Sequence, residues 1–249
     1  MTISVIIPNL NMGRFLPDAI GSVQRQDVPV NEIIVVDNQS TDESRDVIAR
    51  FRRSDGRIRM IEVKPEGPSR ASNAGIAEAR GDLIALLHAD DVWPTRKLRL
   101  QMDRLARAPK VDIVAGFVTY FETLDRERLE PASGSRVETE FLIHVGTSVW
   151  RRSVFDVVGT FDETMRTGGE DCDLFLRVLE AGVPMTILTA PMLYYRRHSG
   201  SMTMAHKEEL KADFARVFAK SLARRRRNGT VGELPRFDSF YEPVAESPS

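Results

Sequence analysis

Carboxylate and amide side chains recur at three places in the N-terminal half, each directly after a short apolar run. The three clusters are Pro8-Asn9, Asp37-Asn38 and His88-Ala89-Asp90-Asp91. Carboxylates bind hard divalent cations, which often share their coordination with substrate phosphates. Asn, Asp and Pro also end strands by turn chemistry alone, so the residue types by themselves leave that alternative open.

A further acidic pair, Glu170-Asp171, follows Gly168-Gly169 and opens an amphipathic pattern that ends near Gly182. The positive end of a helix dipole favours carboxylates in the first turn. The pair therefore either caps this helix or serves a reaction.

Several phosphate-binding motifs are absent from the sequence. No Gly-x-Gly-x-x-Gly follows the first apolar run, and no Gly-Lys-Ser/Thr loop occurs. These absences argue against a dinucleotide oxidoreductase and a P-loop enzyme. A nucleotidyltransferase would carry a Gly- and Arg-rich loop where this chain has Pro8-Asn9-Leu10-Asn11. Bound phosphates would then need another partner, and a metal held by carboxylates is the obvious candidate.

The acidic clusters must be positioned by an alternation of strands and helices. Residues 13–26, 41–53 and 69–78 have helical spacing, with Ser69 as the N-cap of the last helix. Apolar or alternating runs predict strands at Ile3–Ile7, Ile33–Val36, Arg57–Val63 and Leu83–Leu87. This alternation predicts a parallel sheet covered on both faces, with ligands bound outside the carboxyl ends of the strands.

After Pro109 the alternation is weaker. Val111–Val118 and Val145–Trp150 are predicted strands, residues 122–140 a surface loop or hairpin, and Arg152–Val158 a short helix. Trp93 and Trp150 could stack on a bound ligand or belong to the core, and His144 has no motif around it.

Residues 207–227 predict a basic amphipathic helix with eight basic and three acidic side chains. Its apolar stripe consists of Leu210, Phe214, Val217, Phe218 and Leu222. Such a helix either lies on an anionic membrane surface or packs on the preceding domain, with its arginines solvated or paired with acidic patches. The proline-containing tail after Gly229 is predicted to be poorly ordered.

The composition limits the class of protein. The chain has 249 residues, 42% of them hydrophobic, a net charge of −1 and one cysteine, Cys172. This balance argues against a dedicated nucleic-acid binder, and the lone cysteine excludes a disulfide framework and a multi-cysteine zinc site. Without a basic leader or about 18 consecutive apolar residues, the chain is expected to be soluble and cytoplasmic.

Five blocks in order give this sequence its resemblance to the family 2 inverting glycosyltransferases of the GT-A fold. They are Val5–Asn9, Glu32–Asp42, Asn73–Gly75 with Gly81–Asp91, Gly169–Leu174 and Tyr195–His198. The resemblance covers residues 1 to about 205. It implies an α/β fold with a mostly parallel central sheet and helices on both faces.

The resemblance also implies a division of the chain. Residues 1–205 would form the GT-A domain, with a nucleotide-binding half at 1–110 and an acceptor and catalytic half at 111–205. The basic helix would occupy 206–228 and a flexible tail 229–249. The implied activity is metal-dependent transfer of a sugar from a nucleoside diphosphate sugar, most often UDP in this family, to a hydroxyl acceptor.

Each block carries expected roles. The resemblance places Asp171, beside Glu170, as the catalytic base that deprotonates the acceptor hydroxyl. It places Mg²⁺ or Mn²⁺ on Asp90, Asp91 and His198. The residues expected to bind the donor are Pro8, Asn9, Asp37, Arg70, Asn73 and His88.

One position departs from the family pattern. His88 stands where the family commonly has Asp, so the sequence reads His-Ala-Asp-Asp instead of Asp-Ala-Asp-Asp. An imidazole can do a similar job at lower charge. The departure also admits a second hypothesis, a catalytically silent GT-A-like module that binds a nucleotide or glycan. The basic helix adds an expected peripheral contact with the inner face of a membrane.

Overall fold

The computed structural model describes residues 1–165, 168–200, 207–230 and 232–244, with backbone alone at 207–209. Within these residues nine strands form the main sheet, in the order β11-β10-β5-β9-β4-β1-β2-β3 with β8 beside β5. The strands are β1 (Ile3–Asn9), β2 (Glu32–Asp37), β3 (Ile58–Glu62), β4 (Leu83–Leu86), β5 (Ile113–Phe121), β8 (Glu138–Glu140), β9 (Val149–Arg151), β10 (Met185–Arg196) and β11 (Tyr241–Glu242).

The predicted mostly parallel sheet is confirmed. Strands β3, β2, β1 and β4 are mutually parallel, as are β5, β10 and β11. The two groups meet through β9, which is antiparallel to both β4 and β5. All seven residues of β1 are buried, which explains why its sequence is nearly continuously apolar, with Ser4 as an interruption, instead of alternating.

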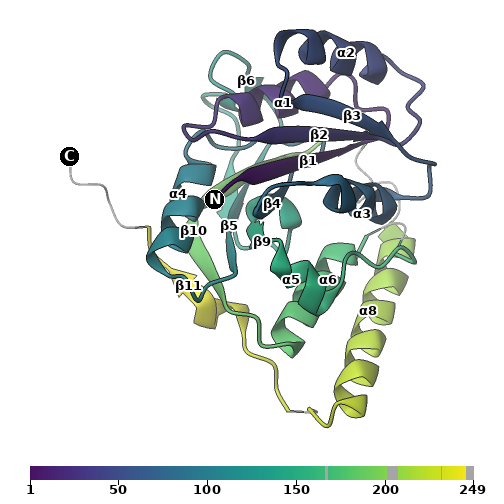
Figure 1. Cartoon of the computed structure of the whole chain (residues 1–249), viewed down its shortest axis with the longest axis vertical. Coiled ribbons are helices and arrows are strands. Elements are labelled where there is room, and N and C mark those ends of the chain that lie inside the picture. Colours follow the sequence, from purple (N-terminus) through teal and green to yellow (C-terminus); the bar gives the residue numbers. More distant parts are fainter. Residues whose placement is uncertain (166–167, 201–206, 231, 245–249) are drawn as a thin grey trace.

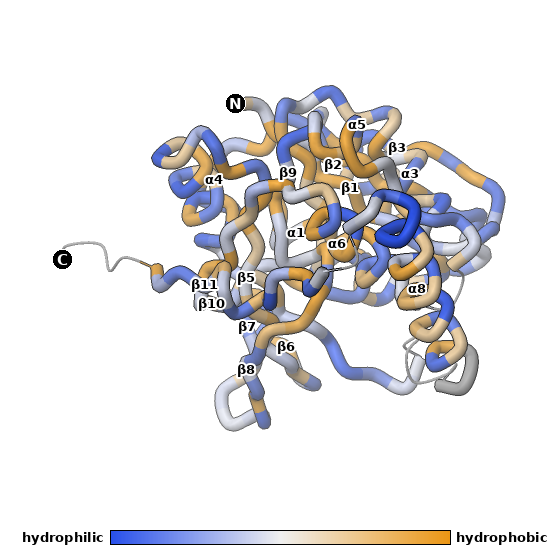
Figure 2. The backbone as a smooth tube through the Cα atoms, turned by 90° about the horizontal axis from the view of Figure 1, so that it is seen from below, coloured by the Kyte–Doolittle hydropathy of each residue, from blue (hydrophilic) through white to orange (hydrophobic). Residues whose placement is uncertain are grey.

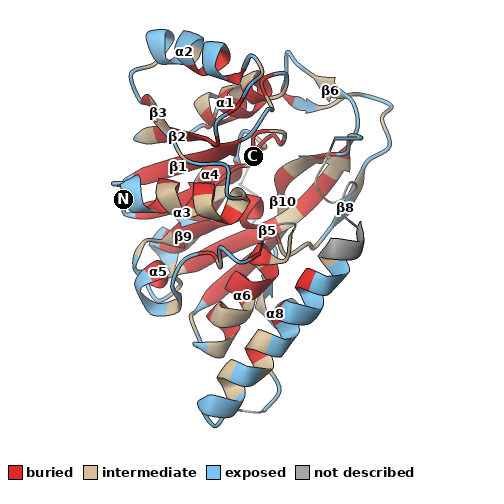
Figure 3. Cartoon of the chain, turned by 90° about the vertical axis from the view of Figure 1, so that its right-hand side faces the viewer, coloured by how far each residue is buried: buried red, intermediate tan, exposed pale blue. Residues whose placement is uncertain are grey.

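Helices cover both faces of the sheet (Figure 1). One buried cluster joins the sheet to α1 (Leu16–Gln24), α2 (Ser44–Ser54) and α4 (Lys97–Arg107). A second cluster on the other face joins it to α3 (Pro68–Glu78), α5 (Ser153–Val158) and α6 (Glu170–Glu180). Figure 3 shows the central strands buried and the outer side of the helices exposed.

Helix α8 (Lys207–Arg227) lies beside α6 (Figure 1). Val217 of α8 is fully buried there. None of the described helices is long and apolar enough to cross a membrane.

Three local predictions differ from the structure. Helix α3 begins at Pro68, with Gly67 at the N-cap, because proline is preset for the first helical position; Ser69 instead donates to the Met165 carbonyl at 3.2 Å. The predicted strand at Val145–Trp150 begins only at Val149. Its first part is a 3₁₀ turn, η1 (Val145–Thr147).

The third difference concerns the tail. Residues Phe237–Phe240 form a second 3₁₀ turn, η2, and the following strand β11 pairs in parallel with β10. The ring of Phe237 packs 5.3 Å from that of Phe141, which gives this segment an apolar anchor. Residues 245–249, with Pro248, lie outside the described residues.

The charged segment 122–140 is a small hairpin, β6 (Leu124–Asp125) with β7 (Glu130–Pro131), followed by β8. These three strands gather at one edge of the molecule (Figure 2). The alternative of a hairpin for this segment is therefore the one that the structure adopts.

Candidate active site

A cavity of about 1230 Å³ opens at the carboxyl ends of β1 and β4. It draws walls from both halves of the chain and from α8. Seven of the residues predicted for the site line it: Pro8, Asn9, His88, Asp90, Glu170, Asp171 and His198. The parallel register brings these ends together, because Asn9 of β1 stands opposite Asp37 of β2.

The cavity is bordered by buried polar atoms that have no hydrogen-bond partner within the described residues. Five of them belong to residues that line it: Asn9 Oδ1, Asn38 Oδ1, Glu170 Oε2, Asp171 Oδ1 and His198 Nδ1. Buried polar groups in native proteins are nearly always paired. Such a concentration of unpaired atoms around one cavity indicates a site that a polar ligand completes.

Asp171 is held by one oxygen only. Its Oδ2 accepts a hydrogen bond from the Val145 backbone N–H at 3.0 Å, while Oδ1 is buried without a partner. Burial, and next the neighbouring Glu170 carboxylate, raise the pKa of Asp171 well above its ordinary value. Burial also raises the pKa of Glu170. Asp171 therefore offers a free oxygen with increased basicity to the cavity.

Two glycines before this pair are required by the backbone and by α8. Gly168 and Gly169 have φ of 143° and 84°, a region that favours glycine. A Cβ on Gly168 would lie 2.4 Å from Leu210 Cδ1, and one on Gly169 would lie 3.3 Å from Val217 Cγ2. Helix α8 thus packs directly on the segment that leads into the candidate base.

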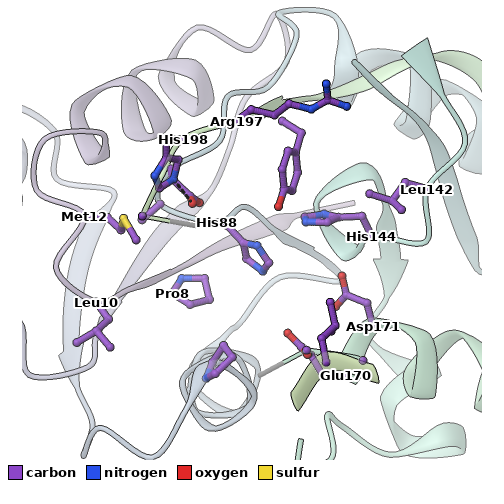
Figure 4. A pocket seen from close by; sticks show the side chains of 18 of the residues that line it. Pro8, Leu10, Met12, His88, Leu142, His144, Glu170, Asp171, Arg197 and His198 are labelled. Atoms are coloured by element: carbon purple, nitrogen blue, oxygen red, sulfur yellow. Dashed lines mark hydrogen bonds and ion pairs between the residues drawn. The ribbon is translucent and has the colours of Figure 1, made fainter. Parts of the chain in front are cut away.

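His198 lies on the opposite side of the cavity from Asp171 (Figure 4), and Asp90 is its partner there. The Nε2 atom of His198 lies 3.1 Å from Asp90 Oδ2. Two cis ligands of an octahedral cation, each about 2.1 Å from the ion, lie about 3.0 Å apart. This separation and the oxygen–imidazole donor set fit a shared divalent cation. The hydrogen bond also contributes to lowering the pKa of Asp90, although burial opposes it.

Asp91 points elsewhere and does not line the cavity. Its Oδ1 accepts the Arg196 backbone N–H at 3.0 Å, and the Arg196 side chain binds the Asp90 carbonyl at 2.8 Å. Burial, and next the charge of Asp90, raise the pKa of Asp91 well above its ordinary value. Asp91 therefore ties the end of β10 to the turn that carries Asp90.

Ligand-type atoms of His88, Asp91 and His144 also lie within 4.8 Å of one another. His144 does not suit a metal in this arrangement, because its Nδ1 already accepts the Gly146 backbone N–H at 3.0 Å. A neutral imidazole that accepts at Nδ1 carries its proton on Nε2, so neither nitrogen has a free lone pair. The Asp90–His198 pair fits a cation better than this cluster.

The nucleotide side of the predicted site is only partly exposed to the cavity. Pro8 and Asn9 line it, but the side chain of Asp37 is fully buried behind them. Asp37 accepts from Asn9 Nδ2 at 3.2 Å and from Arg45 Nε at 3.1 Å. Asn38, which was not predicted as a donor contact, lines the cavity in its place.

Arg70 and Asn73 lie outside the cavity lining, on α3. Arg70 pairs with Glu66 at 2.5 Å. Asn73 exchanges hydrogen bonds of 2.9 Å with the backbone of Phe161 and also donates to Glu163. Both side chains are therefore engaged in contacts of the fold.

His144 is the main site residue that the sequence patterns missed. It lines the cavity, and its ring centroid lies 4.9 Å from that of His88. It precedes a turn instead of ending a strand, so no motif marks it. The two tryptophans belong to the core: Trp93 and Trp150 are 1% and 0% exposed.

Two basic residues of α8 pair with acidic residues in the preceding part of the fold. Arg224 contacts Asp173 at 2.9 Å and Glu180 at 2.7 Å, and Lys220 contacts Asp162 at 2.5 Å. Two of its apolar side chains, Leu210 and Phe214, line the cavity. The predicted packing of this helix on the rest of the fold is therefore observed.

Two solved structures share this fold. S. aureus TarS, crystallised with UDP-GlcNAc, matches with a TM-score of 0.70 and 18% identity over 90% of this chain and 66% of that one. Pyrobaculum calidifontis mannosyltransferase PcManGT, with GDP-Man and Mn²⁺, matches with a TM-score of 0.65 and 18% identity over 94% and 65%. The expected GT-A fold is thus confirmed.

The family follows from the sequence. The model of Glycosyl transferase family 2 matches residues 4–162, more than half of the chain, and the chain belongs to this family. EpsJ of Bacillus subtilis, an uncharacterized glycosyltransferase, is 29% identical over 219 residues, 81% of this chain and 62% of EpsJ.

Two further relatives match over shorter stretches. An uncharacterized glycosyltransferase of Nostoc sp. is 40% identical over 126 residues, 50% of this chain and 38% of that protein. The GalNAc(5)-diNAcBac-PP-undecaprenol beta-1,3-glucosyltransferase of Campylobacter jejuni is 35% identical over 91 residues, 36% and 29% respectively. The chain spans less than two thirds of the length of these relatives.

Proposed function

We propose that this protein is a metal-dependent inverting glycosyltransferase that moves a sugar from a nucleoside diphosphate sugar to a hydroxyl acceptor. The observation that carries the proposal is that two groups of functional side chains, here called poles, lie on opposite sides of one cavity. At one pole Asp171 keeps Oδ1 unpartnered, and at the other Asp90 and His198 lie at the spacing of two ligands of a cation.

The reaction follows from these poles. Oδ1 of Asp171 takes the proton of the acceptor hydroxyl while the hydroxyl oxygen attacks the anomeric carbon. The bond between that carbon and the diphosphate oxygen breaks, and the nucleoside diphosphate leaves with the electron pair. Mg²⁺ or Mn²⁺ on Asp90 and His198 would neutralise the charge that develops on the diphosphate.

The donor side is assigned by position. Pro8, Asn9 and Asn38 supply the wall next to β1 and β2, with Asp37 fixing the Asn9 amide from behind. Related structures hold UDP-GlcNAc, UDP and GDP-Man, which supports a nucleotide sugar and leaves UDP as the first donor to test. His88 contributes an imidazole where the family carries a carboxylate. Arg70 and Asn73 would reach the donor only after leaving their present partners.

A peripheral membrane contact belongs to the same proposal, at the cytoplasmic face of a membrane. Phe214 and Phe218, one helical turn apart on α8, are 38% and 59% exposed, and Phe214 lines the cavity. Arg226 and Arg227 are exposed near the C-terminal end of the same helix. An acceptor linked to a lipid would be presented from that side.

The experiment is nucleoside diphosphate release from a panel of UDP-, dTDP- and GDP-sugars with Mn²⁺ or Mg²⁺. Asp171→Asn should lower transfer by at least about 100-fold, because asparagine can still accept the Val145 N–H but cannot take a proton. The matched control is Asp156→Asn, which makes the same change at an exposed carboxylate on α5 and should leave the rate unchanged. Full activity of Asp171→Asn would reject the base, and a wild-type protein inert with every donor would favour the silent binding module.

A further inference from the structure

The imidazole of His144 has a fixed tautomer, and the proposed reaction assigns its Nε2–H group no role. His144 is 7% exposed and caps η1, with Nδ1 accepting the Gly146 N–H at 3.0 Å. The proton of the neutral ring therefore lies on Nε2. Burial, and next the nearby His88, lower the pKa of His144 to about 3, so the ring stays neutral at working pH.

The Nε2–H group is a donor without an acceptor. The structure gives it no hydrogen bond within the described residues, and the Nδ1 edge is turned to the backbone of η1. Because His144 lines the cavity, the Nε2 edge is the one that the ring presents there. Figure 4 shows the ring projecting toward His88, between the His198 side of the cavity and Asp171.

The position of the ring identifies the part of the substrate that it meets. In a single displacement the anomeric carbon lies between the leaving diphosphate oxygen and the attacking hydroxyl. The transferred sugar must then bridge the Asp90–His198 pole and Asp171. The His144 ring lies 4.9 Å from the ring of His88, which precedes Asp90 by two residues, and the backbone N–H of the neighbouring Val145 donates to Asp171 at 3.0 Å.

We propose that the Nε2–H of His144 donates a hydrogen bond to an oxygen of the transferred sugar and so helps to select the donor sugar. The proposal rests on the proposed function, since it needs a nucleotide sugar in this cavity. A site built to hydrogen-bond a hydroxyl rejects the analogue that lacks it, because its own polar group is then left unpaired.

The turn that carries His144 is anchored by two side chains of the core. Trp93 Nε1 donates to the Gly146 carbonyl at 2.9 Å, and Gln101 Nε2 donates to the Thr147 carbonyl at 2.7 Å. A Cβ on Gly146 would lie 2.9 Å from His144 Nδ1, so the backbone closes against the ring. The Nε2–H group of His144 is therefore held in place before the substrate binds, which is what selectivity requires.

Two substitutions separate this contact from a role in capping the turn. The short side chain of His144→Asn can accept the Gly146 N–H as Nδ1 does, but it does not reach the position of Nε2. The longer side chain of His144→Gln places an amide N–H near Nε2 and gives up the cap. A sugar contact predicts that His144→Gln is the more active variant, whereas a capping role predicts the reverse.

The kinetic test uses the donor that wild-type protein turns over fastest, with nucleoside diphosphate release as the readout. His144→Asn should lose about tenfold in kcat/KM, the size of one neutral hydrogen bond, while its affinity for the nucleoside diphosphate alone stays unchanged. Among monodeoxy forms of that donor, one should be penalised about tenfold by wild type and not by His144→Asn. Higher activity of His144→Asn than His144→Gln, or equal loss of affinity for the nucleoside diphosphate alone, would overturn the proposal.

Two spectroscopic readouts do not depend on turnover. Nitrogen-15 NMR of the His144 ring should show a protonated Nε2 that does not titrate between pH 5 and 8. Electron paramagnetic resonance of Mn²⁺ with UDP should be the same in wild type and His144→Asn. A protonated Nδ1 would overturn the proposal, and loss of Mn²⁺ in the variant would assign His144 to the metal instead. If no donor is turned over by wild type, the proposed function fails and the sugar contact fails with it, while the tautomer is still decided by NMR.

Discussion

Glu170 and Asp171 are adjacent carboxylates in the first turn of α6, and both have buried oxygens without partners. The positive end of the helix dipole favours their ionised forms, whereas burial and mutual repulsion oppose it. Burial raises the pKa of both residues, and the Glu170 charge raises that of Asp171 further, so the dipole does not dominate. A structural cap would be arranged the opposite way, with hydrogen bonds lowering the pKa. The arrangement is typical of a general base.

The pH profile should report this tuning. Asp171 acts only when ionised, so kcat/KM should fall as the pH drops through its raised pKa. Glu170→Gln removes the neighbouring negative charge, lowers the pKa of Asp171 and should move the acid limb to lower pH. Rates measured from pH 5 to 9 with donor held below KM check this. An acid limb that stays in place, or moves to higher pH, would show that burial alone sets the pKa of Asp171.

Metal affinity should separate the two adjacent aspartates. Asp90→Asn removes the carboxylate beside His198 and should weaken Mn²⁺ binding by at least about tenfold. Asp91→Asn keeps the acceptor for the Arg196 N–H and should leave Mn²⁺ binding unchanged. Titration of Mn²⁺ in the presence of UDP, followed by electron paramagnetic resonance, measures both. Equal loss in the two variants would return Asp91 to the set of ligands.

At the scale of elements, α8 supports the candidate base through side chains and backbone. Its residues close over Gly168 and Gly169, and Arg224 bridges Asp173 and Glu180 on α6. The carboxylate of Asp173 is only 2% exposed, so its charge depends on partners within the protein. This ion pair is therefore worth more than a pair at the surface.

Loss of this bridge should lower stability. Arg224→Ala leaves Asp173 paired with Arg177 among the described residues and should cost about 1–3 kcal/mol of unfolding free energy. For a chain of this size the cost corresponds to about 2–4 °C in Tm per kcal/mol. Arg226→Ala, an exposed arginine on the same helix, is the control and should leave Tm unchanged. Equal Tm values for the two variants would show that α8 is held by its apolar contacts alone.

The sheet and its flanking helices were predictable because burial on both faces leaves a direct trace in the sequence. Leu83–Leu87 is a continuous apolar run for this reason, and Ile3–Ile7 is interrupted only by Ser4. The turn η1 left no such trace: Val145 resembles a strand residue, but the Thr147 hydroxyl binds the His144 carbonyl at 2.7 Å and stabilises a turn. Strand β11 was missed because its anchor, Phe237, finds aromatic partners far away in the chain.

The sequence predicted which strand ends form the candidate site. Asn9 and His88 reach the cavity because parallel strands align their carboxyl ends. Side-chain direction within a turn was not predictable, since Asp90 and Asp91 are adjacent and yet have different partners. The hydrogen bond from Asn73 to the Phe161 carbonyl likewise joins segments that are far apart in the sequence.

At the scale of the whole molecule, the cavity belongs to neither half alone. Its walls come from β1 and β4, from the segments before η1 and α6, from the end of β10 and from α8. The near-zero net charge conceals an uneven distribution, since α8 carries several arginines while acidic groups lie on the domain beneath it. Whether the arginines of α8 contact a membrane depends on the residues on the side of α8 that faces away from the domain.

Membrane contact should depend on the exposed aromatic residues of α8. The Phe214→Ser/Phe218→Ser double variant should reduce binding to phosphatidylglycerol vesicles by about tenfold or more, because each inserted phenylalanine contributes roughly 1.5–3 kcal/mol when fully buried. Val157→Ser on α5, where valine is 66% exposed, removes an apolar side chain outside α8 and should leave binding unchanged. Sedimentation with phosphatidylglycerol and phosphatidylcholine vesicles measures both variants. Wild-type binding that is equal on the two lipids, or equal losses in the two variants, would leave α8 as a packing element only, because an anionic surface must act through both its charge and these two rings.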